Sequence, residues 1–418
     1  MNEWRIWHSA KAFAEYVVDH TELANLKGDN LEFKSLPESD ANNPKEFHKI
    51  PDHIKKILYL DAPDIIIERN QEPVLCIECT LGAGTGHAVF QRFSRIVAAI
   101  ENKVPAIYIQ PEGKIVTRKT GVCWDRINPI IFWAYKKLMR TFGIPALIFY
   151  YSSDFKDYEN APQNSPHVKD KGIVYHEDSQ KYLGCPKIDS EMQKFFKVVN
   201  AILSHVGAPA QRLMRNRDIE ERIDWMDKEY YTKAHKELNG MSPITATITI
   251  ETQKLLDYLK RVSCSEEDVI SELLISRPET VIYQCDIDCG EKALRGDPYS
   301  GVLCALDYLL TRNGETVENR TKNLVLCFGK VKKKHDAIHV NSTKSCSIND
   351  FIKVVSNANS RNLLNKQNYS DLKRDAGMIS RYYMQVRHGS TYSKVKLVRV
   401  FSHFADALIF KDGALWRA

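Results

Sequence analysis

The sequence has no apolar run long enough to cross a lipid bilayer, which takes about 20 predominantly apolar residues. Its longest apolar stretches, Ile127–Tyr135 and Gly143–Tyr151, are short and interrupted by proline or polar residues. The opening residues Met1–Arg5 lack the basic-then-apolar order of a signal peptide. These absences argue against a membrane-spanning protein and predict a soluble protein of the cytoplasm.

An excess of charge of one sign is also lacking: the 418 residues carry a formal net charge of +6. This balance is compatible with a polyanionic partner but does not by itself indicate one. The ten cysteines are spread along the chain, which is typical of reduced thiols, so we predict no disulfide. Cys76 and Cys79 form a Cys-x-x-Cys pair, but a strand turns their side chains to opposite faces and no second pair follows. We therefore predict no zinc site.

Helix-like and strand-like patterns alternate along the whole chain, which is typical of the α/β fold class. We expect a first domain over residues 1–210, a charged connecting helix within 211–240, and a second mixed α/β domain over 241–418. The expected helices are Ala10–Val18, His87–Lys103, Ile127–Phe142, Asp189–Val206, Thr252–Ser263 and Val302–Leu310, and the expected strands are Ala106–Gln110, Pro145–Tyr151, Thr245–Thr249, Val281–Asp288, Asn323–Phe328 and Lys394–Phe401.

A β-hairpin is the sharpest local prediction. Arg69–Pro73 is a polar turn of the kind that joins antiparallel strands. It separates an apolar segment, made of Ile57–Leu60 and Pro63–Glu68, from a second apolar segment at Val74–Thr80. A glycine-bearing turn and an amphipathic helix follow, so strand, turn, helix and strand succeed one another in the order of a crossover unit.

The expected register of this hairpin brings two carboxylates together. If the turn is centred on Gln71, residues whose numbers sum to 142 face each other, so Asp64 faces Glu78. Thr80 lies on the same face as Glu78 because side chains alternate along a strand. Two facing carboxylates repel one another unless a cation or a donor offsets their charge. The sequence therefore predicts a hard metal ion with oxygen ligands at this position.

These residues resemble a known nuclease superfamily. Pro63-Asp64, then Glu78-Cys79-Thr80 on the next strand, then a helix with Gln91 on its polar face, resemble the PD-(D/E)xK core over roughly residues 10–150. The resemblance implies a restriction-endonuclease-like mixed sheet flanked by helices, and a Mg²⁺ ion for which Mn²⁺ can substitute. It also implies that Asp64, Glu78 and the backbone carbonyl of Cys79 bind this ion. Such an ion orients the scissile phosphate and helps to generate hydroxide.

Thr80 departs from the superfamily pattern, in which a lysine usually occupies this position. A threonine hydroxyl supplies no positive charge to the nucleophile or the phosphate. Arg92 and Arg95, on the helix face expected to lean over the sheet, are the substitutes, and His87 at the helix start is another. Members of the superfamily often place a glutamate on the first helix. Glu15 is the expected position here, with Glu32 as a competitor.

The resemblance implies an endonuclease of double-stranded DNA, of a type II restriction or related defence system. An RNA endonuclease of the same fold, or a catalytically silent nucleic-acid-binding or assembly protein, is an open alternative. A homodimer and a companion methyltransferase are compatible with the resemblance, and no membrane partner is expected. Basic residues of the second domain are candidates for phosphate contacts, although ordinary solvated strands and loops explain them almost as well. These candidates are Lys332, Lys333, Lys334, Arg381 and Arg387.

Overall fold

The computed structural model divides the chain into two compact units. Unit 1 comprises residues 1–38 and 50–238, and unit 2 comprises 39–49 and 239–418. The structure describes residues 3–28, 30–36, 49–58, 62–80, 85–110, 113–118, 121–126, 129–150, 174–176, 181–183, 190–234, 247–262, 272–285, 298–312, 320–334, 336–341, 347 and 404–416. We expected the domains to divide near Gly240, and the two units divide after Leu238.

A mixed six-stranded sheet forms the centre of unit 1, with the strand order β2-β1-β3-β4-β5-β8. β1 pairs antiparallel with β3, and β3 pairs antiparallel with β4, whereas β4, β5 and β8 run parallel. The strands of this sheet are β1 (Trp4–His8), β2 (Leu31–Ser35), β3 (Ile65–Arg69), β4 (Glu72–Cys79), β5 (Ala106–Gln110) and β8 (Ala146–Tyr150). Two small hairpins are β6 (Gly113–Arg118) with β7 (Gly121–Arg126) and β9 (Val174–His176) with β10 (Lys181–Leu183).

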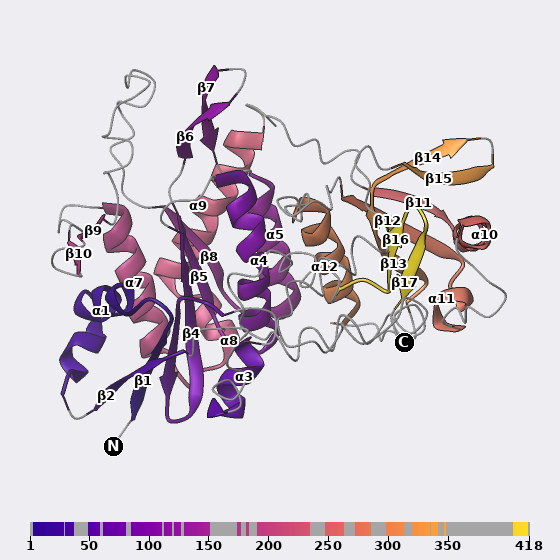
Figure 1. The fold of residues 1–418 in the computed structure, drawn as a ribbon. Coiled ribbons are helices and arrows are strands. Elements are labelled where there is room, and N and C mark those ends of the chain that lie inside the picture. Colours follow the sequence, from indigo (N-terminus) through magenta and orange to yellow (C-terminus); the bar gives the residue numbers. More distant parts are fainter. Residues whose placement is uncertain are drawn as a thin grey trace. The chain divides into compact units, whose positions relative to one another are not determined.

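Helices cover both faces of this sheet, as Figure 1 shows. α4 and α5 pack on one face, and α7 packs on the other, where Phe195 meets Phe149 of β8. β5 and β8 are buried throughout, as expected of strands covered on both sides. The helices are α1 (Lys11–Asp19), the 3₁₀ helix η1 (Glu22–Leu26), α3 (Asp52–Leu58), α4 (Thr85–Glu101), α5 (Ile130–Phe142), α7 (Ser190–Ser204), α8 (Ala210–Met214) and α9 (Arg217–Ala234).

The predicted hairpin is confirmed, together with its register next to the candidate carboxylates. Ile65 pairs with Ile77 and Ile66 with Cys76, so their numbers sum to 142 as expected. The turn itself is tighter than predicted, because Asn70 and Gln71 both have positive φ, at 51° and 65°. Two such residues make the turn that matches the twist of paired strands. A β-bulge between Ile67 and Glu68 shifts the register by one residue between the turn and the pairs near the carboxylates.

Three local predictions for unit 1 were incomplete or wrong. Ile57–Leu60 was expected to be extended, but α3 continues to Leu58, so Ile57 and Leu58 lie on the buried face of a helix. The strand β1 was missed, although it is the strand that pairs with β3. α9 was expected to be an exposed connector because of its charge. It packs against α5 and β8 instead, with Ile219, Arg222 and Met226 buried.

Unit 2 has a five-stranded mixed sheet with the order β11-β12-β13-β16-β17 and a separate β14–β15 hairpin. No described helix in either unit has both the length and the apolar character needed to span a membrane. The predicted strand at Lys394–Phe401 lies outside the described residues. The elements are β11 (Thr247–Glu251), α10 (Thr252–Val262), α11 (Glu272–Ser276), β12 (Glu279–Cys285), α12 (Pro298–Arg312), β13 (Lys322–Phe328), β14 (Lys330–Lys334), β15 (Ala337–Asn341), β16 (Ala407–Phe410) and β17 (Gly413–Trp416).

Candidate active site

Asp64 lies at the bend that leads into β3, and backbone and hydroxyl donors hold its carboxylate. The backbone N–H of Cys79 donates to Oδ2 at 2.8 Å, and the hydroxyl of Ser9 donates to Oδ1 at 3.2 Å. The Cys79 contact ties Asp64 to the end of β4, next to Glu78. The two carboxylates are close enough for the charge of Asp64 to disfavour ionisation of Glu78.

Glu78 is buried, with 1% of its surface exposed, and two arginines of α4 contact one of its oxygens. Arg95 Nη1 donates to Oε1 at 2.5 Å, and Arg92 Nε lies 3.0 Å from the same oxygen. Among the described residues, the other oxygen, Oε2, is buried and has no hydrogen-bond partner. Burial raises the pKa of Glu78 to about 7, Arg95 and Arg92 oppose that rise, and Asp64 adds to it. The prediction that these arginines lean over the sheet is confirmed.

The polar face continues from β4 onto β5. Glu78 pairs in parallel register with Tyr108, and the Tyr108 hydroxyl donates to Thr80 Oγ1 at 3.0 Å. Thr80 is therefore a buried hydrogen-bond acceptor and carries no charge to replace a lysine. Gln110, two residues beyond Tyr108, is also buried, and its Nε2 has no partner in the described part of the chain. Unsatisfied buried groups of this kind call for an explanation such as an ion or water.

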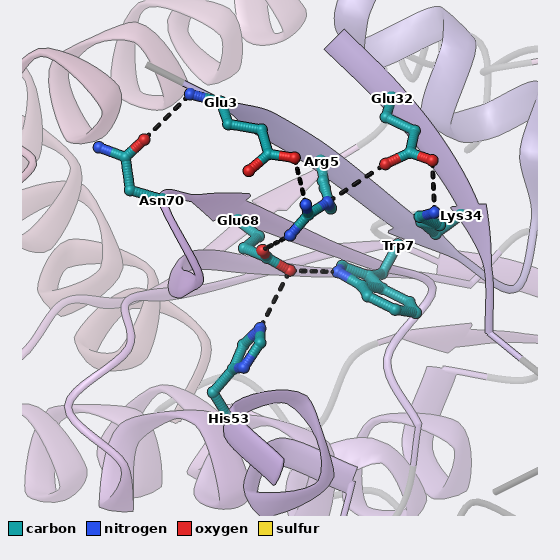
Figure 2. A network of polar contacts seen from close by, with 8 residues as sticks. All are labelled: Glu3, Arg5, Trp7, Glu32, Lys34, His53, Glu68 and Asn70. Carbon is teal, nitrogen blue, oxygen red and sulfur yellow. Dashed lines mark hydrogen bonds and ion pairs between the residues drawn. The ribbon is translucent and has the colours of Figure 1, made fainter. Parts of the chain in front are cut away.

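A second buried glutamate on the same hairpin provides an internal comparison. Glu68 is as buried as Glu78, but both of its oxygens are used. Figure 2 shows its carboxylate between Arg5, Trp7 and His53. Arg5 Nη1 donates to Oε1 at 2.8 Å, Trp7 Nε1 donates to Oε2 at 2.5 Å, and His53 Nε2 lies 3.2 Å from Oε2. Glu68 thus joins β1 and α3 to the hairpin, whereas one oxygen of Glu78 has no partner among the residues that the structure describes.

The donor set around Asp64 and Glu78 fits a hard cation in part. Two carboxylates and nearby carbonyls are the ligands that Mg²⁺ prefers, and the unpaired Glu78 Oε2 provides one coordination position. No group of three or more His, Cys, Asp or Glu side chains is placed for metal binding within the described ranges. A Mg²⁺ ion usually keeps several waters and takes only one or two carboxylates. The pair, completed by the Cys79 carbonyl and water, is therefore compatible with this ion.

The structure does not bring every predicted site residue to this pair. Glu15 lies on α1, where it is partly exposed and 3.7 Å from Lys11, and no hydrogen bond or ion pair with a described residue joins it to Asp64 or Glu78. Glu32 contacts Arg5 and Lys34 in the network of Figure 2. Gln91 and His87 lie in α4, but their side chains are outside the described part of the structure.

The predicted basic residues of unit 2 are only partly described. Lys332, Lys333 and Lys334 lie on β14 and are exposed. β14 pairs with β15, and Ile338 of β15 is buried in the core of unit 2. The lysines therefore stand on a β-ribbon that is anchored by apolar residues. Arg381 and Arg387 lie outside the described residues.

Sequence reasoning missed three residues around the carboxylate pair: Ser9, Tyr108 and Gln110. Tyr108 and Gln110 gave the same signal as Glu78 and Thr80, because they are polar groups at a period of two in an otherwise apolar strand. The position of Ser9 followed only from β1, whose pairing with β3 was not predicted. Comparison of the chain with protein-family models, with curated proteins and with solved structures found no match.

Proposed function

We propose that unit 1 is a Mg²⁺-dependent endonuclease of the PD-(D/E)xK type that hydrolyses DNA, within a type II restriction or related defence system. The observation that carries the proposal is the closeness of Asp64 to Glu78 at the end of a β-hairpin, where a buried oxygen of Glu78 has no described partner. The connection from the hairpin through α4 to the parallel strand β5 agrees with the restriction-endonuclease-like arrangement.

The residues of the site have separate tasks in this proposal. Asp64, Glu78 and the Cys79 carbonyl would hold the ion, which when bound supplies Lewis-acid stabilisation of the phosphate and lowers the pKa of water. Ser9 and the Cys79 N–H orient Asp64. Arg95 holds the other oxygen of Glu78.

Arg92 is the candidate for the missing lysine charge. Its side chain is 26% exposed, whereas that of Arg95 is 7% exposed, so it is the more accessible of the two cations to a phosphate. Guanidinium groups bind phosphate oxygens through paired N–H donors. Thr80, held by Tyr108, serves in orienting water by hydrogen bonds and not by charge.

A catalytically silent nucleic-acid-binding protein is the second candidate. The observation that favours it is the pairing of both arginines with Glu78, which offsets the carboxylate charge without a metal. An RNA endonuclease differs from the first proposal only in substrate. The exposed lysines of β14 suit the phosphate backbone of either nucleic acid.

Cleavage assays separate these functions. Supercoiled plasmid and a structured RNA are each incubated with the protein and Mg²⁺ or Mn²⁺, and with EDTA as a blank. We expect plasmid cleavage that Asp64→Asn and Glu78→Gln abolish and that Glu72→Gln, an exposed change on the same strand, leaves intact. Cleavage of RNA alone would favour the RNA enzyme. Equal cleavage by the wild type and both site variants, or none by any of them, would refute the proposed nuclease site.

A further inference from the structure

A pocket of about 590 Å³ lies on the surface of unit 1, away from the carboxylate pair. It is formed where α7 ends, α8 passes and α9 begins. Every ionisable side chain that lines it is an arginine or a histidine, and none of the lining residues is acidic. The polar lining consists of His205, Gln211, Arg212, Arg215, Asn216 and Arg217.

Two of the three arginines of this pocket have no acidic partner among the described residues, whereas Glu221 and Asp218 act on Arg217. Arg212 and Arg215 are exposed, and no ion pair with a described residue involves either of them. They are three residues apart across the end of α8, a spacing that places side chains on one side of a helical turn. Arg217 has a partner, Glu221, at 2.8 Å, but both side chains are exposed, and exposed ion pairs are weak.

The pocket lies at the end of the sheet opposite to the candidate active site. The backbone N–H of Tyr150, at the end of β8, donates to Glu191 at the start of α7, at 3.4 Å. Phe195, one turn further along α7, contacts Phe149, so α7 runs back along β8 toward the start of that strand. The far end of α7, next to His205, lies about 22 Å from its first residue. Asp64 and Glu78 lie toward the ends of the parallel strands. A ligand in the pocket is thus distinct from a phosphate held by the carboxylate pair.

The shape and chemistry of the pocket favour the phosphate backbone of a nucleic acid. A small-molecule site normally encloses most of its ligand and has a mainly apolar lining. Here Arg212, Arg215 and Arg217 are all exposed, so a ligand would lie along the surface. Arginine side chains on an open surface are suited to successive phosphates, which they contact without reading the base sequence.

We propose that this arginine pocket of α7, α8 and α9 binds the phosphate backbone of nucleic acid at a site remote from the scissile phosphate. The inference rests on the proposed function for the identity of its ligand. Binding at this site anchors the substrate without taking part in bond cleavage, and it does not depend on a metal ion.

The test measures binding in EDTA, where no cleavage occurs. A fluorescein-labelled 20-base-pair DNA duplex is titrated with wild-type protein and with Arg212→Gln/Arg215→Gln, from 50 to 200 mM salt, with anisotropy as the readout. Lys194→Gln/Lys197→Gln is the matched control, because these exposed lysines have the same spacing on α7 and do not line the pocket. Circular dichroism confirms that each variant is folded.

We expect the arginine variant to lose roughly ten- to a hundredfold in affinity at 100 mM salt, and to lower the slope of log affinity against log salt by about 2. The control is expected to bind as the wild type does. Unchanged affinity and slope in the arginine variant overturn the inference. Pyrophosphate is tested as a competitor in the same assay, and tighter binding of pyrophosphate than of the duplex also overturns it. An arginine variant that loses binding while wild-type protein fails to cleave with Mg²⁺ supports this inference and refutes only the proposed nuclease.

Discussion

Replacing Glu78 with glutamine tests whether the site disfavours a buried charge. Burial raises the pKa of this carboxyl from 4.5 to about 7 in the folded protein. Between these pH values the folded protein holds a proton that the unfolded chain releases. The stabilising effect of this proton is therefore complete below about pH 4.5 and is lost as the pH rises through about 7.

The size of the effect follows from the shift. At about 1.4 kcal/mol per pKa unit, the rise from 4.5 to about 7 amounts to about 3 kcal/mol of unfolding free energy. Glutamine has no proton to lose, so the variant lacks this dependence on pH. The opposing effect of Arg92 and Arg95 is already contained in the pKa of about 7, so it needs no separate correction.

Urea unfolding in EDTA between pH 5 and pH 8 measures this difference. Tryptophan fluorescence reports mainly on unit 1, which contains five of the six tryptophans: Trp4, Trp7, Trp124, Trp133 and Trp225. We expect the unfolding free energy of the wild type, relative to Glu78→Gln, to fall by up to about 3 kcal/mol as the pH rises over this range. Glu72→Gln on the same strand serves as the exposed control. A difference that is flat with pH, or that grows as the pH rises, would show that folding does not raise the pKa of Glu78.

Three further changes follow from the same hairpin and its surroundings. Gln71→Gly should stabilise unit 1 by about 1 kcal/mol in urea unfolding, because glycine adopts the positive φ of 65° without strain; a loss of stability would contradict the turn conformation. Glu68→Gln should cost about 3 kcal/mol in the same assay, because Arg5 loses its buried anionic partner, and an effect below 1 kcal/mol would show that the network of Figure 2 is not formed. Arg95→Ala should slow plasmid cleavage by about 100-fold, because it removes the cation that opposes the raised pKa of Glu78. Arg95→Lys keeps that cation and should slow cleavage by less; equal rates in both variants would exclude a role for the charge of Arg95.

The sequence was most informative where polar residues interrupt an apolar strand. Glu78 on β4 and Thr80 just beyond it stand out because every neighbour from Val74 on is apolar or cysteine. The closeness of Asp64 to Glu78 could be inferred from the turn. The turn consists of Asn70 and Gln71 and is shorter than the predicted Arg69–Pro73, and the bulge near Ile67 restores the expected pairing. Local patterning therefore predicted the pairing correctly from a slightly incorrect turn.

Other features depend on contacts that are distant in sequence. β1 is short and contains Arg5 and His8, so its apolar pattern is weak, and only pairing with β2 and β3 identifies it as a central strand. The charge of α9 indicated an exposed helix, yet Arg222 is buried between aromatic rings. Its Nε donates to the Ile148 carbonyl, which helps to compensate for the loss of solvent. The arginine pocket likewise results from the meeting of three helices, which no local pattern contains.

The position of a bound Mn²⁺ ion tests directly whether Asp64 and Glu78 hold a metal. Crystals of the wild type and of Asp64→Asn are soaked in Mn²⁺, and anomalous diffraction locates the metal. We expect an anomalous peak in the wild type within coordination distance of carboxylate oxygens of both Asp64 and Glu78, and its loss in the variant. Occupied metal sites elsewhere on the protein, with Glu78 still paired only to Arg92 and Arg95, would contradict it.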